Sequence, residues 1–395
     1  MAEFCLDCWN QIMETDDPEE NFIFSDQLQL CEGCGKLQYT IVAIREEPLI
    51  FPRNDLRSVA SCDKIILYQT KEATPMRTHI QSLMNRLNFP PEAIEYFLAI
   101  FDHTTPEDFA YLRTLEDRFV HCPDEREIED QIGAEIRTLL SDWAKAQNIP
   151  PFSADMFFLL LCSKNLKTRY EEENLSDEMY YDLMDDLACK LRECKQTQGI
   201  WGTTTFPWFQ WHLKLRRFAL GRFQYEAFPF RKHSGDRVGD RDEYTIAGVT
   251  VRTDDIVYRF HIPSSGSMPR EKRLESYKKA YDFFGGRNMP GGKIVIFCET
   301  WLLYPENEHI YPENSNLLDF FHDFTIVARE ETRPGTIFPN DWRVFGRSFD
   351  GDVSVLPQKT SLQRNFAAWL AQGGTVGSGF GLIIFDGEKI LNRED

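Results

Sequence analysis

Between Thr74 and about Gly199, apolar residues recur at the three- to four-residue spacing of a helix face. Sets with this spacing include Ile94, Phe97, Leu98 and Phe101, then Phe109, Leu112, Leu115 and Phe119, and then Ile132, Ile136, Leu139, Leu140 and Trp143. Oxygen-bearing residues ahead of acidic first turns predict helix starts at Thr105, Ser153 and Ser176. Phe157–Cys162 is apolar all round, which predicts a buried helix. We therefore predict an all-helical domain over residues 73–200.

From Trp201 onward the pattern changes to short alternating runs that are typical of strands. The clearest run is Ile256–Ile262, which Pro263 ends. Further strands are predicted at Phe218–Phe230, Tyr244–Val251, Lys293–Cys298, Thr325–Arg329, Trp342–Phe349 and Gly381–Phe385. Helices are predicted at Pro269–Phe284, at Ser315–Phe324 and, from a capping box, at Thr360–Leu370. The glycine-rich segment Gly373–Gly381 is interpreted as a flexible connection into the last strand, with a role in ligand contact left open.

Two cysteine pairs, Cys5-x-x-Cys8 and Cys31-x-x-Cys34, stand 22 residues apart. This spacing is close to that of a four-thiolate zinc ribbon, and four ligands fill a tetrahedral structural site. Chance thiols or a redox pair are weaker interpretations because the pair occurs twice. We expect residues 1–72 to form a zinc ribbon with a short β extension. Its strands are predicted at Leu37–Arg45, Pro48–Pro52 and Cys62–Tyr68.

The formal net charge of the 395-residue chain is −19. Nucleic-acid phosphates and anionic membranes both attract basic surfaces, so this charge argues against either as a partner. No apolar run reaches the roughly 20 residues of a membrane span, and the start of the chain lacks the pattern of a signal peptide. Ten cysteines in such a chain favour a reducing, cytoplasmic setting.

A short turn between the Ile256 strand and the following helix offers a candidate phosphate site. The turn consists of Ser264, Ser265, Gly266, Ser267 and Met268, and the first helical turn carries Arg270, Lys272 and Arg273. A helix start presents unpaired N–H groups and a positive dipole end, which bind phosphates. Three cations at that end suit a nearby polyanion. Solvated surface charges are an equally good interpretation of these residues alone.

Several motifs, taken together, resemble a bacterial acyltransferase family. They are Phe218-x-x-Gly221-Arg222-Phe-Gln224-Tyr-Glu226, His261-Ile-Pro263, Trp301-Leu-Leu303 before Pro305, Ser315-Asn316 and Leu356-Pro357-x-x-Thr360-Ser361-Leu362-Gln363-Arg364. The resemblance is dense over Trp201–Gly381, loose over the helical region and absent from the first seventy or so residues. It implies an α+β chain in which a GNAT-like acyltransferase domain, residues 201–395, follows the helical domain.

The resemblance also implies the chemistry: direct transfer of an acyl group from acyl-CoA, expected to be acetyl-CoA, to a small-molecule or peptide amine. Strands four and five of the superfamily separate to form the thioester slot, which places His261 and the Cys298–Thr300 region at its walls. Candidate general bases are Glu226, His261 and Glu299. A salt bridge for Glu226 and a core hydrogen bond for His261 are the competing structural roles. Asn316, in the Ser315-Asn316 motif, joins the candidate cofactor residues.

Two departures from the superfamily pattern leave alternatives open. The helix after the fifth strand lacks the usual tyrosine acid, so Tyr304, Tyr311, His322 or water would protonate the leaving thiolate. The cofactor turn lacks the full superfamily glycine signature. A competing function is therefore a non-catalytic protein that senses a ligand or docks a protein partner through its zinc ribbon. Cys298 is expected to be a buried strand residue rather than a nucleophile.

Overall fold

The computed structural model describes residues 22–24, 29–30, 37–38, 41–44, 62–123, 126–230, 241–264, 266–332, 341–346, 349 and 351–393. The chain divides into two compact units, Met1–Thr70 and Lys71–Asp395. None of the helices in these described stretches is long and apolar enough to cross a membrane.

The first unit contains two short antiparallel pairs. β1 (Phe22–Phe24) pairs with β4 (Ile41–Ile44), and β2 (Gln29–Leu30) pairs with β3 (Leu37–Gln38). The predicted strand Leu37–Arg45 is therefore two short strands, whereas the predicted strand Pro48–Pro52 lies outside the described residues. The four cysteines predicted to bind zinc, Cys5, Cys8, Cys31 and Cys34, also lie outside them.

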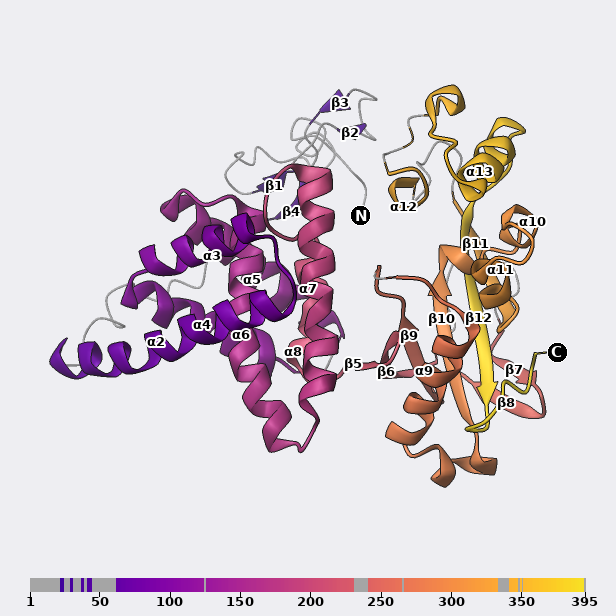
Figure 1. Ribbon diagram of the computed structural model, residues 1–395, viewed down its shortest axis with the longest axis horizontal. Coiled ribbons are helices and arrows are strands. Elements are labelled where there is room, and N and C mark those ends of the chain that lie inside the picture. Colours follow the sequence, from indigo (N-terminus) through magenta and orange to yellow (C-terminus); the bar gives the residue numbers. More distant parts are fainter. Residues whose placement is uncertain are drawn as a thin grey trace, which may run out of the picture. The chain divides into compact units, whose positions relative to one another are not determined.

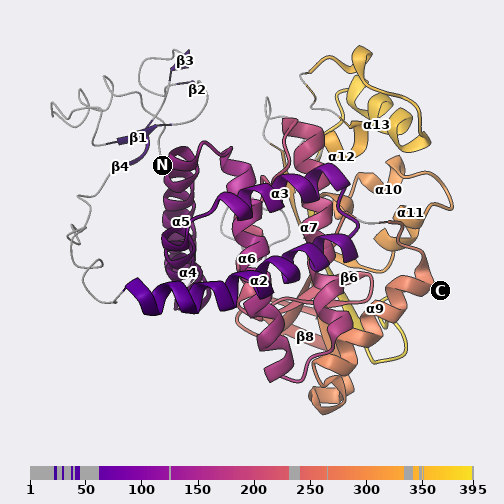
Figure 2. The same ribbon diagram turned by 60° about the vertical axis from the view of Figure 1, so that its left-hand side comes forward.

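Six helices lead from this unit through the helical part of the second one. They are α2 (Cys62–Arg86), α3 (Pro91–His103), α4 (Pro106–His121), α5 (Arg126–Gln147), α6 (Pro151–Glu172) and α7 (Asp177–Gln198). α5, α6 and α7 run alongside one another (Figure 2). The central helix α6 is buried over residues 153–163, as its all-round apolar sequence predicts. A short 3₁₀ turn, η2 (Phe206–Phe209), and α8 (Gln210–Leu213) then lead to the sheet.

Two predictions for the helical part are wrong. Cys62–Tyr68 belongs to α2 and not to a strand, because a short apolar run has no periodicity that separates a strand from a helix. The helix start predicted at Ser153 lies at Pro151, where proline's fixed φ suits the first helical position. The predicted caps at Thr105 and Ser176 are present: each side chain accepts a backbone N–H of the first turn.

The remaining residues build a six-stranded mixed sheet in the order β11-β12-β10-β9-β6-β5 (Figure 1). The strands are β5 (Phe218–Leu220), β6 (Phe223–Pro229), β9 (Ile256–His261), β10 (Ile294–Thr300), β11 (Thr325–Glu331) and β12 (Gly377–Phe385). β9 and β10 are parallel, and the other neighbours are antiparallel. A separate hairpin is formed by β7 (Glu243–Ile246) and β8 (Val249–Arg252), so the predicted single strand Tyr244–Val251 is two strands.

Helices α9 (Arg270–Phe283), α10 (Asn307–Ile310), α11 (Asn316–Phe321), α12 (Asp341–Phe345) and α13 (Ser361–Ala371) accompany the sheet, with short 3₁₀ turns at Gly286–Asn288, Pro290–Gly292, Trp301–Leu303 and Val353–Val355. The capping box predicted at Thr360 opens α13. The strand predicted at Trp342–Phe349 is wrong, because Asp341–Phe345 is helical. An aspartate at the first position favours a helix start through the dipole, and this outweighs the strand preference of the following aromatic and valine residues.

Residues 377–381 of the glycine-rich segment belong to β12, so the predicted connection into the last strand is confined to residues 373–376. A Cβ atom at Gly379 would lie 1.8 Å from the backbone oxygen of Leu303, and one at Gly377 would lie 2.1 Å from that of Glu330. Contacts this short exclude any side chain, so these glycines allow backbone segments to pack directly on the strand. The segment is therefore explained by packing without a phosphate.

Candidate active site

A buried carboxylate, Glu226 on β6, gathers three basic side chains on one face of the sheet. Its Oε2 accepts hydrogen bonds from Arg217 Nε at 3.1 Å and Nη2 at 2.9 Å. Its Oε1 accepts from Arg259 and, at 3.0 Å, from His261 Nε2. The antiparallel register opposes Glu226 to Arg259 and Gln224 to His261, which explains why these side chains share a face.

The cluster shifts the pKa of both titrating members. Burial alone would raise the pKa of Glu226, but the hydrogen bond from His261 and the charges of Arg217 and Arg259 outweigh it and hold that pKa well below its usual range. Burial and the charge of Arg217 lower the pKa of His261 to about 3, against the opposing effect of Glu226. At neutral pH the pair is therefore a carboxylate and a neutral imidazole. Because the carboxylate can only accept, Nε2 carries the proton and Nδ1 is left as the acceptor.

Aromatic and polar residues of the helical part cover this pair. The Trp208 ring stands edge-on to the His261 ring with centroids 4.7 Å apart, and Arg217 lies 4.0 Å over the same indole. Trp208 Nε1 donates to Asp186 Oδ2 on α7 at 2.7 Å. The segment before β5 thus fixes the imidazole between the carboxylate and a packed indole.

Beyond this cluster, β9 and β10 separate. Their parallel pairing is limited to Tyr258–Ile296 and Arg259–Phe297, so His261 and the end of β10 are not paired with each other. Glu299 and Phe297 lie on the same side of β10, and Phe297 pairs with Arg259. Glu299 is therefore on the Glu226 face, but it is exposed.

Cys298, the neighbour of Glu299 on β10, is fully buried. Burial raises the pKa of its thiol, which agrees with a packing role and not with a nucleophile.

The candidate phosphate turn is held from behind by Arg222. Its Nε donates to the Ser267 carbonyl at 3.1 Å, and its Nη2 donates to the carbonyls of Pro263 and Gly266, each at 3.1 Å. The φ of Gly266 is +72°. In each peptide unit the C=O and N–H groups point in opposite directions. Because the guanidinium binds three carbonyl oxygens of the turn, the N–H groups of the same peptide units point away from it. Ser264, Gly266 and Ser267 are exposed there, and Ser265 lies outside the described residues.

The predicted cofactor cations separate into two groups. Arg270 and Lys272 are exposed on the first turn of α9, whereas Arg273 is fully buried. Arg273 donates to an Asp323 oxygen, to an Asp319 oxygen and to the Met268 carbonyl oxygen, and the nitrogen–oxygen distance is 2.7 Å in each case. Its donors are thereby used in joining α9 to α11, so it serves the fold and is not presented to a phosphate.

The two other predicted cofactor residues, Met268 and Asn316, also differ in burial. The Met268 side chain is part of the core, whereas Asn316 is exposed at the start of α11.

The structure does not distinguish one of the candidate general acids Tyr304, Tyr311 and His322, because each side chain already has a hydrogen-bond partner. Tyr311 is buried and donates to the Leu302 carbonyl at 2.8 Å, and Tyr304 shares a 2.9 Å hydrogen bond with Thr375. His322 forms an exposed pair with Glu308 at 3.2 Å.

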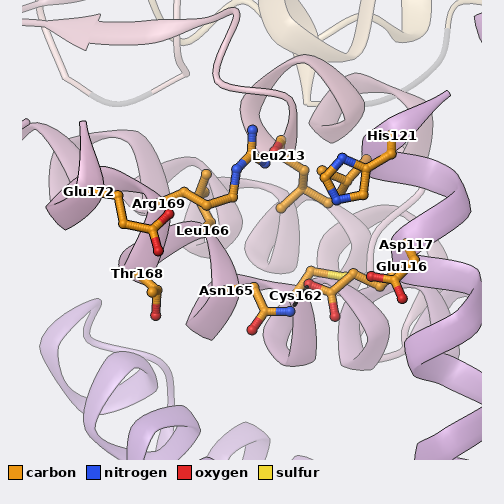
Figure 3. A pocket seen from close by; sticks show the side chains of 11 residues that line it. Glu116, Asp117, His121, Cys162, Asn165, Leu166, Thr168, Arg169, Glu172 and Leu213 are labelled. Carbon is orange, nitrogen blue, oxygen red and sulfur yellow. Dashed lines mark hydrogen bonds between the residues drawn. The ribbon is translucent and has the colours of Figure 1, made fainter. Parts of the chain in front are cut away.

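Two cavities adjoin these elements. One, of about 350 Å³, lies between α7, the β5–β6 turn and α9, and includes Gln224 and Lys272 in its wall. The other, of about 180 Å³, lies in the helical part between α4 and α6 (Figure 3). In the second, Glu116 accepts from Asn165 and Arg113, and Arg169 donates to the Leu213 carbonyl, so its main polar groups already have partners.

Sequence reasoning named Glu226 and His261 but missed Arg217 and Trp208. Alternation along the Ile256 strand places Arg259 on the face of His261, where its charge is expected to lower the pKa of the imidazole, and the structure agrees. Strand register then brings Arg259 to Glu226. Arg217 and Trp208 carry no local signal at all. Within the described stretches, no group of three or more His, Cys, Asp or Glu side chains is arranged to hold a metal ion. The zinc prediction concerns residues beyond those stretches.

Comparison with known families agrees with this architecture. Residues 217–383 match the family described as GNAT-like C-terminal domain, and residues 78–215 match the N-acyltransferase N-terminal domain. Together, the two matches support assignment of the chain to the acyl-CoA-dependent N-acyltransferases. The domain limits drawn at residues 72 and 200 stay predictions. A comparison with curated protein sequences gives no match.

Solved structures of acyltransferases share the fold at low sequence identity. One, in complex with decanoyl-CoA and teicoplanin, is 20% identical with a TM-score of 0.55, and the match covers 77% of this chain and 86% of that one. A mutant acyltransferase in complex with octanoyl-CoA is also 20% identical, with a TM-score of 0.54 and coverage of 76% and 86%. A complex with CoA and 10C-teicoplanin is 19% identical, with a TM-score of 0.52 and the same coverage.

Proposed function

We propose that this protein transfers an acyl group from acyl-CoA to a primary amine, and that His261 accepts the proton of the attacking nitrogen. The observation that carries the proposal is the Glu226–His261 pair at the end of β9, beside the point where β9 and β10 separate. A neutral imidazole with a free Nδ1 and an orienting carboxylate is the arrangement that general-base catalysis requires.

The acceptor enters as an amine that has given one proton to solvent, and its nitrogen forms a bond to the thioester carbonyl carbon. As the C–S bond breaks, the CoA thiolate leaves and takes up a proton from water. The nitrogen loses its second proton to His261, and Glu226 stabilises the imidazolium while it exists. Because N–H acidity rises sharply during attack, a base with a pKa near 3 can still accept this proton.

The roles of the other residues follow from their positions. Glu226 is a positioning residue, since its oxygens are already occupied by Arg217, Arg259 and His261. Glu299 remains a second candidate base on the same sheet face. The diphosphate of CoA would bind the exposed side of the Ser264–Ser267 turn, with Arg270 and Lys272 nearby and Arg222 holding the turn.

The acyl chain and the acceptor are finer points of the proposal. Acetyl-CoA is the donor that the sequence resemblance suggests. Octanoyl-CoA and decanoyl-CoA are bound by the solved structures with this fold, so a medium-chain donor is the alternative. A complex of one such structure with teicoplanin makes a peptide-like acceptor a reasonable choice beside a simple amine.

Thiol release tests the function. Purified full-length protein is mixed with acetyl-, octanoyl- or decanoyl-CoA, with and without an amine panel, and free thiol is followed over time. Amine-dependent release that falls at least tenfold in His261→Gln supports the proposal. Saturable binding of every acyl-CoA without amine-dependent release would favour the ligand-sensing alternative.

We also propose that Cys5, Cys8, Cys31 and Cys34 bind one structural zinc ion. The antiparallel β2–β3 pair supports this, because its two strands flank the second cysteine pair in the sequence. Four thiolates would complete the coordination and stabilise a small unit with few described strands. Elemental analysis of protein purified without added metal should find one zinc per chain, and its absence would refute the assignment.

A further inference from the structure

The larger cavity, of about 350 Å³, is at the lower end of the roughly 300–1,000 Å³ typical of small-molecule sites. α7 contributes Asp182, Asp185 and Asp186 to its wall, and β6 contributes Gln224. The three aspartates share one helix face because they are spaced at i, i+3 and i+4.

Three polar side chains in this wall have buried atoms with unused hydrogen-bonding capacity, and one of them is Arg222, whose Nη1 has no partner among the described residues. Gln224 is 1% exposed, and its amide lies close enough to Asp186 to lower the pKa of that carboxyl, but neither amide atom forms a well-aligned hydrogen bond to the described residues. Asp186 is 3% exposed, and its Oδ1 is likewise without a partner while Oδ2 accepts from Trp208. Buried polar atoms are normally paired, so a wall with four such atoms, two acceptors and two donors, fits a ligand that supplies one donor-rich group and one acceptor.

The charge of the wall selects the sign of that ligand. Four carboxylates, those of the three aspartates and Glu275, face two cations, Arg222 and Lys272. Arg222 donates three hydrogen bonds to carbonyl oxygens of the phosphate turn. Burial raises the pKa of Asp186 and of Asp182, although Lys190 opposes this shift at Asp186 and Lys279 opposes it at Asp182. A cation is favoured, and the polyanionic end of CoA is disfavoured.

The cavity adjoins the candidate base through one of its wall residues, Gln224. Gln224 is the register partner of His261, and side chains opposed in this way have Cβ atoms about 4.5–5.5 Å apart. A ligand that hydrogen-bonds Gln224 is therefore next to the imidazole.

We propose that this cavity binds the acyl acceptor, and that the acceptor is a small diamine with an oxygen between its amino groups. One ammonium would donate to Asp185 and to Asp186 Oδ1, the oxygen would accept from the Gln224 amide, and the other amino group would face His261. The inference rests on the proposed acyl transfer and adds the substrate class to it.

Calorimetry with 1,3-diaminopropan-2-ol tests this, using full-length protein with and without saturating CoA. Glycerol, which has hydroxyl groups in place of both amines, is the matched neutral ligand. Asp185→Asn removes one carboxylate at the half-buried rim, and Gln224→Leu removes the amide at similar volume. Glu95→Gln, on the exposed face of α3, is the control with the same change in net charge.

We expect saturable binding of the diamine, none of glycerol over the same range, and weaker binding as salt is raised. Loss of one charge-assisted hydrogen bond should raise Kd at least about tenfold in Asp185→Asn, whereas Glu95→Gln should not change it. No saturable diamine binding in either condition, equal binding of glycerol, or an unchanged Kd in Asp185→Asn would overturn the inference. If Gln224→Leu does not fold, Asp185→Asn decides.

Titration of the same preparations with CoA distinguishes failure of the acceptor assignment from failure of the proposed acyl transfer. Normal CoA binding and amine-dependent thiol release without diamine binding would remove only the acceptor assignment. If the wild-type protein does not bind CoA, the result would instead count against acyl transfer itself.

Discussion

Replacement of Glu226 by glutamine should be strongly destabilising, because it removes the carboxylate that pairs with both Arg217 and Arg259. Glu226 is fully buried, Arg217 is 2% exposed and Arg259 is 19% exposed. Glutamine preserves the shape, but it removes the negative charge and keeps only one accepting oxygen for the donors of Arg217, Arg259 and His261. If its NH₂ group faces Arg217, the Trp208 carbonyl at 3.2 Å is the remaining described acceptor of that guanidinium. Breaking a buried ion pair in this way costs about 3–5 kcal/mol. That is a large part of the roughly 5–15 kcal/mol that stabilises a typical protein.

Urea unfolding followed by circular dichroism measures this loss. Glu306→Gln is the matched control, since Glu306 also pairs with an arginine, Arg329 at 2.7 Å, but both side chains are partly exposed. Its loss should be below about 1 kcal/mol. The double variant Arg217→Met, Glu226→Gln should recover part of the loss, because the uncompensated charge is gone. Equal midpoints for Glu226→Gln and Glu306→Gln would refute the view of Glu226 as the centre of a buried network.

Three further predictions concern the turn, the pH response and β12. Arg222→Met should raise the Kd for acyl-CoA about tenfold in calorimetry, because the turn loses the donor that orders it; an unchanged Kd would place the diphosphate elsewhere. The folded-state pKa of His261, about 3, lies below its unfolded value, so its contribution to stability is present above about pH 6.5 and is lost as pH falls towards 3. Urea midpoints between pH 7 and pH 4 should therefore decrease less in His261→Gln, and parallel curves would contradict this. Gly379→Ala should lower stability by about 3 kcal/mol or more, because its methyl group would overlap the Leu303 carbonyl. Gly266→Ala, with open space around it, should cost only about 1–2 kcal/mol of φ strain, and a Gly379→Ala cost no larger than this would argue against tight packing on β12.

Local signals explain which elements could be predicted from sequence. The capping boxes at Thr105 and Thr360 are complete within four residues, so sequence alone identifies both helix starts. The buried helix α6 was predictable because an all-round apolar run has few alternatives. At Cys62–Tyr68 and Trp342–Phe349 the apolar residues fit a strand or a helix equally, and neighbouring structure decides between them.

The site was less predictable because strand register and tertiary packing assemble it. Glu226 and His261 were named separately, but their 3.0 Å contact depends on the alignment of β6 with β9. Arg273 looked like a phosphate ligand because it follows a turn at a helix start. In the fold it faces inward to Asp323, fifty residues further along the chain, and no local pattern carries that information.

The central claim is that His261 and its neighbours transfer an acyl group to nitrogen. The most direct test is mass spectrometry of a reaction between the full-length protein, isotope-labelled acyl-CoA and an amine acceptor, run in parallel with His261→Gln of confirmed fold. The account predicts a labelled amide in the wild type and at least tenfold less in the variant. Labelled free acid without amide, or an amide yield unaffected by the His261 substitution, would contradict it.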